Sequence, residues 1–213
     1  MSPLKLVHRA QLPPLAPGQL APAVVMVHGW QGDEKVMSVF ERTLPPAVAI
    51  ISPRAPLDMH NAGFGWYEPV DDEASQLAGL ATLREFVAGL PAEYPIDSNR
   101  VILMGFSQGA AMSNALLLSD PPLVAAVASL AGFLPQAARR WLQPGRLTGK
   151  SVFIAHGTAD TTVPTARALA ARDDLMSAGA NVEYHDYPIT HKLNAQGMRD
   201  LKDWLARQLP ALS

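Results

Sequence analysis

Short apolar runs alternate with amphipathic segments along most of the chain. The apolar runs predict buried strands at residues 24–27, 48–51, 99–104, 124–130, 151–155 and 182–187, with an edge strand at residues 4–10. Apolar residues at helical spacing predict helices at residues 76–90, 165–178 and 193–209. This alternation favours an α/β fold with a mostly parallel, doubly wound sheet and helices on both faces.

The length and composition fit one domain of this kind. The chain has 213 residues, of which 48% are hydrophobic, so it can bury a sizeable core. We therefore expect a single domain over residues 1–213. The formal net charge of -2 and the lack of a basic block argue against nucleic acid as a partner. Without cysteine, the chain has no disulfide, thiolate metal site or cysteine nucleophile.

Targeting and membrane signals do not stand out. Residues 1–20 contain charged residues and four prolines, and lack the continuous apolar segment of a signal peptide. No apolar run long enough to span a membrane occurs elsewhere in the sequence. We expect a cytoplasmic protein without an integral membrane segment. The sequence leaves the oligomeric state open, and a homodimer is compatible with it.

The most informative motif is Gly105-Phe106-Ser107-Gln108-Gly109, which follows a predicted strand and opens a stretch of small residues. It predicts a nucleophile elbow, a sharp strand-to-helix turn that holds a serine hydroxyl above the edge of the sheet. The two glycines relieve the crowding in such a turn. A base can then take the proton of Ser107 while the serine oxygen attacks an acyl carbon. The motif therefore indicates esterase chemistry.

A serine nucleophile needs a base, and His191 is the best placed of the six histidines. It lies between the last predicted strand and the last predicted helix, in a loop at the sheet edge where ligands bind in such folds. His185 lies inside the predicted strand, so we assign it to the sheet. His28 and His156 each precede a glycine at a strand end, and we interpret both as loop-shaping residues.

The base in turn needs a carboxylate that holds its tautomer, and Asp160 is the predicted one. It follows a predicted strand, in a loop whose shape is fixed by a glycine and a proline. Asp173 and Asp174 compete for this role, but their position in a predicted helix favours a solvated face. The chain order Ser107, Asp160, His191 is the order expected for an α/β-hydrolase.

The developing oxyanion needs backbone donors, and the sequence offers two. One is the amide of Gln108, which directly follows the nucleophile. The other belongs to the loop at residues 28–33, whose glycines permit close backbone approach. We expect the amide of Trp30 to serve, with that of Gln31 as the alternative. An ordinary glycine-rich turn is the competing interpretation, whereas a phosphate site is disfavoured because the loop lacks a phosphate-binding motif.

In these motifs the sequence resembles the carboxylesterase and lysophospholipase group of α/β-hydrolases, which includes acyl-protein thioesterases. The matching segments, in order along the chain, are residues 28–33, 52–56, 65–67, 105–109, 131–135, 156–160 and 163–164. The resemblance covers most of the chain. It implies an α/β-hydrolase fold without a large lid, activity on carboxylic esters or thioesters, the triad Ser107, Asp160 and His191, and no cofactor or metal.

The substrate pocket is less clearly indicated. Members of this group commonly carry a glycine before the catalytic histidine and an acidic residue after it, whereas this chain has Thr190 and Lys192. Substrate contacts near the histidine are therefore not carried over. Trp66 matches the tryptophan of the group, and we expect it to form an acyl wall with Phe64, while Val163 faces the same cleft. Packing of these aromatic residues against the core is the alternative.

The predicted function is hydrolysis of carboxylic esters or thioesters of small to medium acyl chains through an acyl-enzyme intermediate. The expected substrate is a small-molecule or lipid-like ester, and a lysophospholipase or an acyl-protein thioesterase is the alternative. A peptidase would use the same three residues. A non-catalytic binding protein on this fold would more often lack one of them.

Overall fold

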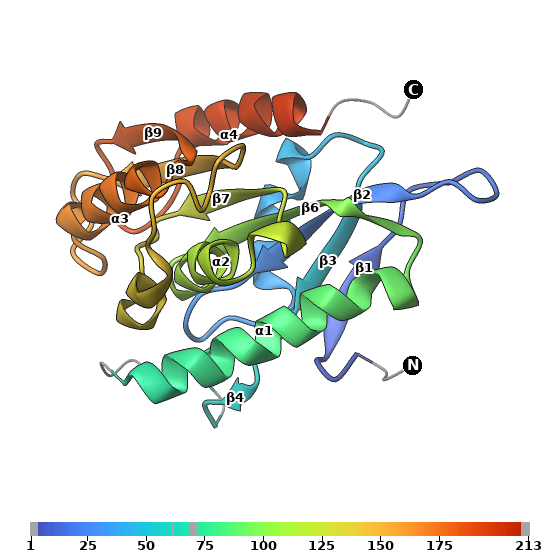
Figure 1. Cartoon of the computed structure of the whole chain (residues 1–213), viewed down its shortest axis with the longest axis horizontal. Coiled ribbons are helices and arrows are strands. Elements are labelled where there is room, and N and C mark those ends of the chain that lie inside the picture. The colour runs from blue at the N-terminus through green and yellow to red at the C-terminus, as the bar shows by residue number, and fades with distance from the viewer. Residues whose placement is uncertain (1–3, 61, 69–71, 210–213) are drawn as a thin grey trace.

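The computed structural model describes residues 4–60, 62–68 and 72–209. Its centre is a seven-stranded sheet with the strand order β1-β3-β2-β6-β7-β8-β9 (Figure 1). All neighbouring strands are parallel except β1, which pairs antiparallel with β3 at the edge. The strands are β1 His8–Gln11, β2 Ala21–Val27, β3 Ala49–Pro53, β6 Ile96–Phe106, β7 Ala126–Leu130, β8 Ser151–Gly157 and β9 Asn181–Tyr187.

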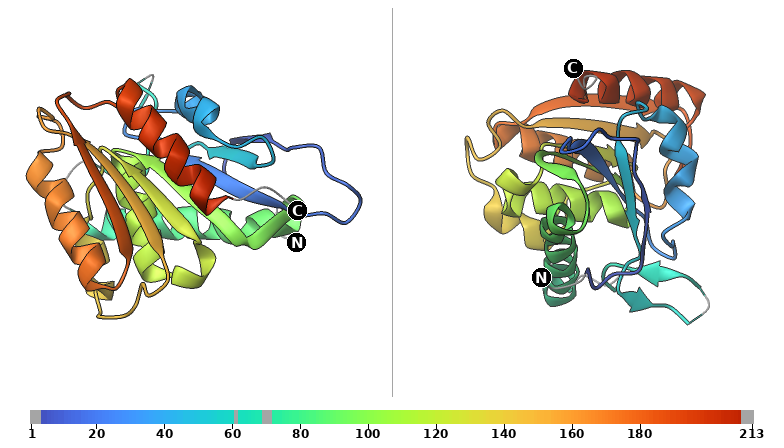
Figure 2. Two further views of the ribbon diagram at one scale, coloured as in Figure 1. Left: turned by 90° about the horizontal axis from the view of Figure 1, so that it is seen from above. Right: turned by 90° about the vertical axis from the view of Figure 1, so that its right-hand side faces the viewer.

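Helices cover both faces of this sheet. The α-helices are α1 Glu73–Glu93, α2 Gln108–Ser119, α3 Thr165–Ser177 and α4 Ala195–Gln208. Three 3-10 helices complete them: η1 Val36–Thr43, η2 Pro121–Leu123 and η3 Gln136–Trp141. The first three α-helices pack on one face, while η1 and α4 lie together on the other, as the two views of Figure 2 show. The predicted doubly wound α/β fold is confirmed.

The two faces of the central strands explain why their sequences are apolar throughout. Side chains alternate between the faces, so Val25 and Leu103 pack under α1 and α2, whereas Met26 and Met104 pack under η1 and α4. A parallel strand covered on both sides has no solvent face and therefore needs no polar positions. Each such side chain contributes roughly 1.5–3 kcal/mol by its burial.

All seven predicted strands and all three predicted helices are present, and the differences lie at their ends. The strand expected at residues 99–104 extends over Ile96–Phe106, and the helix expected at residues 76–90 extends over Glu73–Glu93. The Asp72 side chain accepts a hydrogen bond from the amide of Ala74 and so caps the start of that helix. The predicted single domain includes residues 1–3 and 210–213, which lie outside the described residues.

The three 3-10 helices and a small hairpin were not predicted, because none of them carries a long periodic pattern, and two of these elements lie near the loop after β2. The first is η1, which follows the loop after β2. The second is a small antiparallel hairpin, β4 Leu57–Asp58 and β5 Phe64–Gly65, which stands apart from the main sheet. The backbone of Phe64 also bridges to Gly32, so this hairpin is attached to the loop that follows β2.

Candidate active site

Ser107 stands in a strained turn between β6 and α2. Its backbone angles, φ 53° and ψ -116°, lie in a region that residues other than glycine rarely adopt. The turn depends on its glycines, because a Cβ at Gly109 would overlap the carbonyl oxygen of Val27. The amide of Ser107 donates to the carbonyl of Leu130 at 2.9 Å, which ties the turn to β7. Strain of this kind is held by its surroundings and is typical of functional residues.

His191 and Asp160 are in direct contact. The Nδ1 atom of His191 lies 2.7 Å from Oδ2 of Asp160. Because an ionised carboxylate can only accept, Nδ1 carries the hydrogen and Nε2 is free to act as a base. The two loops meet because of Gly157, where a Cβ would overlap the carbonyl oxygen of Ile189. The ring of Phe106, next to Ser107, packs 5.0 Å from the His191 ring between centroids.

Asp160 is held as a carboxylate by several donors. Its side chain is fully buried, and burial by itself opposes ionisation. The hydrogen bond from His191 outweighs this effect together with two hydrogen bonds from backbone amides. The amides of Val163 and Thr162 each donate to Asp160 at 2.9 Å. The pKa of Asp160 therefore lies below its usual value. The group stays ionised and keeps the imidazole in one orientation.

A second histidine supports the same loop. His156 is fully buried, and its Nε2 atom lies 2.8 Å from the carbonyl oxygen of Val163 and 3.5 Å from Oδ2 of Asp160. Because the carbonyl can only accept, Nε2 carries the hydrogen. Its Nδ1 atom has no hydrogen-bond partner among the residues that the structure describes. His156 thus braces the turn that presents Asp160, in line with its interpretation as a loop-shaping residue.

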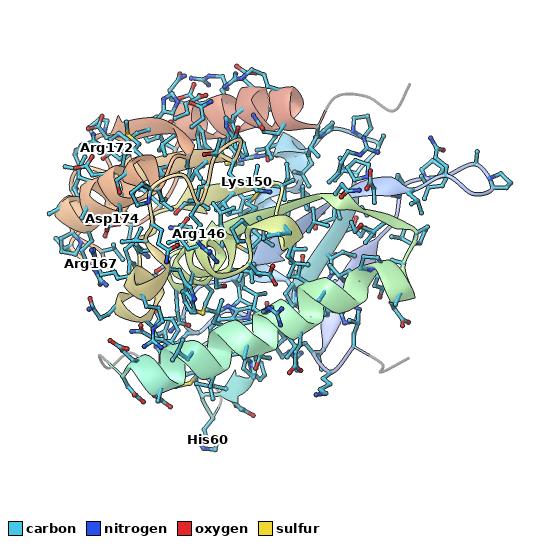
Figure 3. The ribbon with its side chains drawn as sticks, in the orientation of Figure 1. His60, Arg146, Lys150, Arg167, Arg172 and Asp174 are labelled. Atoms are coloured by element: carbon cyan, nitrogen blue, oxygen red, sulfur yellow. The ribbon has the colours of Figure 1, made fainter. Side chains whose placement is uncertain are left out.

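Other histidine and aspartate side chains lie away from this site. The Nε2 atom of His185 lies 2.9 Å from Glu183 on the same strand, β9. His60 projects from the segment between β4 and β5, away from the main sheet (Figure 3). Asp174 belongs to α3 and lies 2.9 Å from the guanidinium of Arg139. Neither this aspartate nor the two histidines line the cavity beside Ser107.

The loop after β2 passes directly over the serine. A Cβ at Gly29 would lie 3.3 Å from the Cβ of Ser107 and 3.1 Å from the carbonyl oxygen of Phe106, so glycine there avoids a tight contact. Among the described residues, none accepts a hydrogen bond from the backbone amides of Trp30, Gln31 or Gln108. Gln31 adopts a positive φ of 61°. These three amides are available to an oxyanion, and the choice between Trp30 and Gln31 stays open.

A cavity of about 730 Å³ opens beside these groups. Ser107 and His191 both line it, together with the loop after β2. Its remaining lining comes mainly from η1 and from the start of α4: Val36, Met37, Val39, Phe40, Arg42, Lys192, Leu193, Asn194, Ala195 and Met198. The sequence did not point to the lining residues of η1, because that segment shows no long pattern. The only signal was the short apolar set at residues 36–40.

The predicted acyl wall needs a correction. Trp66 is 1% exposed and lies inside the core, where its ring nitrogen donates to the carbonyl of His28 at 2.9 Å. Its expected place on the cavity wall is therefore wrong, and the alternative of core packing holds. Val163 is also buried, against Phe133, and Phe64 lies under the guanidinium of Arg54. Neither lines this cavity, and their contact with substrate stays a prediction.

Comparison with known proteins adds the family. The sequence pattern of the phospholipase/carboxylesterase family matches residues 17–209. The chain belongs to this family. Among curated relatives, it is 29% identical over 177 residues to lysophospholipase-like protein 1 of Mus musculus, covering 76% of this chain and 74% of the relative. It is 28% identical over 209 residues to acyl-protein thioesterase 1 of Mycosarcoma maydis, with 86% of each chain covered.

Solved structures give the same fold. The Bacillus cereus carboxylesterase superposes with a TM-score of 0.85 at 24% identity, over 97% of this chain and 96% of the other. A carboxylesterase of Mesorhizobium loti superposes with a TM-score of 0.81 at 23% identity, over 97% of each chain. As a member of the phospholipase/carboxylesterase family, the protein is a hydrolase of the carboxylesterase type.

Two further features concern metal ligands and helix hydropathy among the described residues. Within residues 4–60, 62–68 and 72–209, no cluster of three or more histidine, aspartate or glutamate side chains is arranged to hold a metal ion. Over the same residues, none of the helices combines the length and the hydropathy that a membrane span needs.

Proposed function

We propose that Ser107 is the nucleophile of this hydrolase, His191 its general base and Asp160 the group that orients the base. The observation that carries the proposal is that Ser107 and His191 line one cavity while His191 lies 2.7 Å from a buried, ionised Asp160. The strained backbone of Ser107 supports the same role, because a sharp strand-to-helix turn of this kind is typical of a nucleophile elbow.

The reaction has two halves. The Ser107 oxygen forms a bond to the acyl carbon while Nε2 of His191 takes the serine proton. The amide of Gln108 and that of Trp30 or Gln31 stabilise the oxyanion, and the bond to the leaving group breaks as His191 protonates that group. Water then attacks the acyl-enzyme with His191 again as the base, which releases the acid and restores Ser107. Asp160 stays ionised throughout.

The substrate class that fits best is a carboxylic ester or thioester with a small to medium acyl chain. The cavity is large enough for such a chain and is bordered by apolar side chains. Acyl-protein thioesterase 1 and lysophospholipase-like protein 1 are relatives, so a lysophospholipid or an acylated protein is the second candidate. A peptidase or a binding protein remains the alternative from other classes.

Covalent labelling tests the proposal directly. A fluorophosphonate should label the wild-type protein at Ser107 and fail to label Ser107→Ala. Turnover of p-nitrophenyl esters should fall by about three to six orders of magnitude in that variant, because the triad acts as a unit. A matched control is Ser113→Ala, a buried serine on α2 outside the cavity lining. Near-normal activity of folded Ser107→Ala would falsify the assignment.

Three coarser expectations can be tested alongside. We propose that residues 1–213 act as a single domain, which a single cooperative unfolding transition would support. The cytoplasmic location stays a prediction that cell fractionation tests. The oligomeric state, including a homodimer, is settled by light scattering of the purified protein.

A further inference from the structure

The cavity beside Ser107 contains an apolar region with a defined position. It lies between η1, which contributes Val39 and Phe40, and the start of α4, which contributes Met198. Leu193, two residues before α4, borders the same space. Val39 is 59% exposed although it is apolar. An apolar wall open to solvent beside a nucleophile is suited to a hydrophobic part of a substrate.

Two cations share this wall. Arg42 is near the end of η1 and Lys192 directly follows His191, and both line the cavity. No aspartate or glutamate is among the described residues that line it. Within the part of the chain that the structure describes, neither cation forms an ion pair or a side-chain hydrogen bond. The protein as a whole carries a net charge of -2, so this positive lining is local.

The acidic residues in and next to η1 make their hydrogen bonds and ion pairs with groups other than Arg42 and Lys192. One carboxylate oxygen of Asp33 accepts the amides of Lys35 and Val36, at 2.8 and 3.0 Å. Glu34 is buried against Arg54. Glu41 lies 3.7 Å from Arg9 and accepts a hydrogen bond from Gln11 at 3.0 Å. The charge of Arg42 and Lys192 is thus left for a ligand.

We propose that this site prefers esters that end in an anionic oxygen group, a carboxylate or a phosphate, joined to the ester by a short apolar segment. The apolar segment lies between η1 and α4, and the anionic group meets Arg42 and Lys192. The guanidinium of Arg42 suits such a group because its planar N–H donors match two oxygens at once. The inference rests on the proposed function of Ser107 and His191 and deepens it by naming the substrate class.

Matched substrate pairs test the preference. In the first pair, the p-nitrophenyl monoester of adipic acid is compared with the same ester whose free carboxylate is capped as a methyl ester. In the second pair, the carboxylate is moved to the alcohol half, as acetyl-ω-hydroxyhexanoate and its methyl ester. A third pair replaces that carboxylate with phosphate. It compares hexanediol that carries one acetyl ester and one phosphate with hexanediol that carries one acetyl ester and a free hydroxyl. Comparison of the three pairs shows whether the cavity accepts the anionic group on the acyl half or on the alcohol half of the ester. It also shows whether a carboxylate or a phosphate is preferred.

The measured quantity is the ratio of kcat/KM for the anionic substrate to that for its neutral partner. We expect this ratio to exceed one in at least one arm for the wild type, and to fall by about three- to tenfold in Arg42→Gln. Raising the ionic strength should lower the wild-type ratio in the same arm, because salt screens exposed charges. Lys192→Gln should lower it further when combined with Arg42→Gln.

The matched control is Arg199→Gln, which removes the same charge from an exposed position on α4 outside the cavity lining. It should leave the ratio unchanged. A wild-type ratio at or below one in every arm overturns the inference, and so does an equal fall in Arg199→Gln. If the neutral esters are hydrolysed and Ser107 is labelled in that case, the proposed function survives alone. If neither occurs, both proposals fail.

Discussion

The side-chain oxygen of Gln108 accepts a hydrogen bond from the backbone amide of Trp66 at 2.8 Å. The amide group of the same side chain donates to the carbonyl of Tyr67 at 2.7 Å. The residue that follows Ser107 therefore fastens the segment after β5 to the start of α2. This contact explains why Trp66 is a packing residue: its backbone is tied to the nucleophile turn while its ring fills the core.

The first prediction concerns Trp66. Trp66→Ala should lower the free energy of unfolding by about 3–5 kcal/mol, because it leaves a large cavity in the core. Any loss of kcat/KM should be equal for acetyl and octanoyl esters, since the ring does not line the substrate cavity. Urea unfolding and an acyl-length series measure both effects. A loss of kcat/KM that grows with acyl length, at an unchanged free energy of unfolding, would show that Trp66 contacts the substrate.

The second prediction separates two histidines. His191→Ala should lower kcat by about three to six orders of magnitude, because among the described residues that line the cavity with Ser107 it is the only histidine and none is an aspartate or glutamate. His185→Gln should have a mild effect, since that ring pairs with Glu183 on β9 and does not line the cavity. Steady-state kinetics on both purified variants decide this. The reverse ranking would mean that the base has been assigned to the wrong end of β9.

The third prediction follows from the lowered pKa of Asp160. A depressed pKa means that the carboxylate stabilises the fold above its unfolded pKa, and that this contribution is lost only as pH falls through the lower folded value. Asp160→Asn should lower kcat by about three to four orders of magnitude, because the amide no longer enforces the imidazole tautomer. The variant should also lose less stability than the wild type on acidification below about pH 4.

The measurements for Asp160→Asn are kcat at neutral pH and urea midpoints between neutral and acidic pH. Circular dichroism at neutral pH shows whether the fold is retained. Asp173→Asn is the matched control, because Asp173 is an exposed aspartate on α3 that pairs with its neighbour Arg172. Equal kinetic losses in the two variants would contradict the role of Asp160.

The fourth prediction concerns the ion pair between Glu34, in the segment between β2 and η1, and Arg54, which follows β3. The guanidinium of Arg54 donates to both carboxylate oxygens of Glu34, at 2.7 and 3.0 Å, and lowers the pKa of Glu34 to about 2. Because the folded pKa is depressed, the pair stabilises the protein fully above the usual glutamate value of 4.5 and loses this effect as pH falls toward 2.

Glu34→Gln should therefore lower the urea midpoint at pH 7 and should make little difference near pH 2. Glu85→Gln is the control, because it removes an exposed pair with Lys5 that contributes little. Urea titrations of both variants across this pH range provide the measurement. A destabilisation of Glu34→Gln that is independent of pH would show that side-chain packing, and not charge, matters at this position.

The elements that the sequence predicted well share a physical cause. A strand buried on both faces needs an unbroken apolar run, as at Val101–Met104 within β6, and an elbow needs glycines on both sides of its serine. These requirements act between near neighbours in the chain, so they are visible in the sequence. The α4 helix is equally visible, because its buried Leu201, Trp204 and Leu205 recur at helical spacing.

The elements that were missed depend on distant partners. The η1 segment is a short 3-10 helix, and its place beside α4 follows from the docking of two segments far apart in the chain. The buried place of Trp66 follows from its contacts with His28 and Gln108, which no local pattern reveals. A tryptophan near a predicted site is compatible with either packing or binding until those partners are known.

By itself, the sequence determined the alternation of strands and helices, the nucleophile turn around Ser107 and the candidate partners Asp160 and His191, because local sterics and hydrophobic periodicity leave few alternatives there. The tertiary structure alone decided which of the remaining side chains meet. It places Nδ1 of His191 at 2.7 Å from Oδ2 of Asp160. It also places Trp66 in the core and Arg42 on the cavity wall. Those outcomes depend on how whole elements pack, and packing is a property of the folded chain.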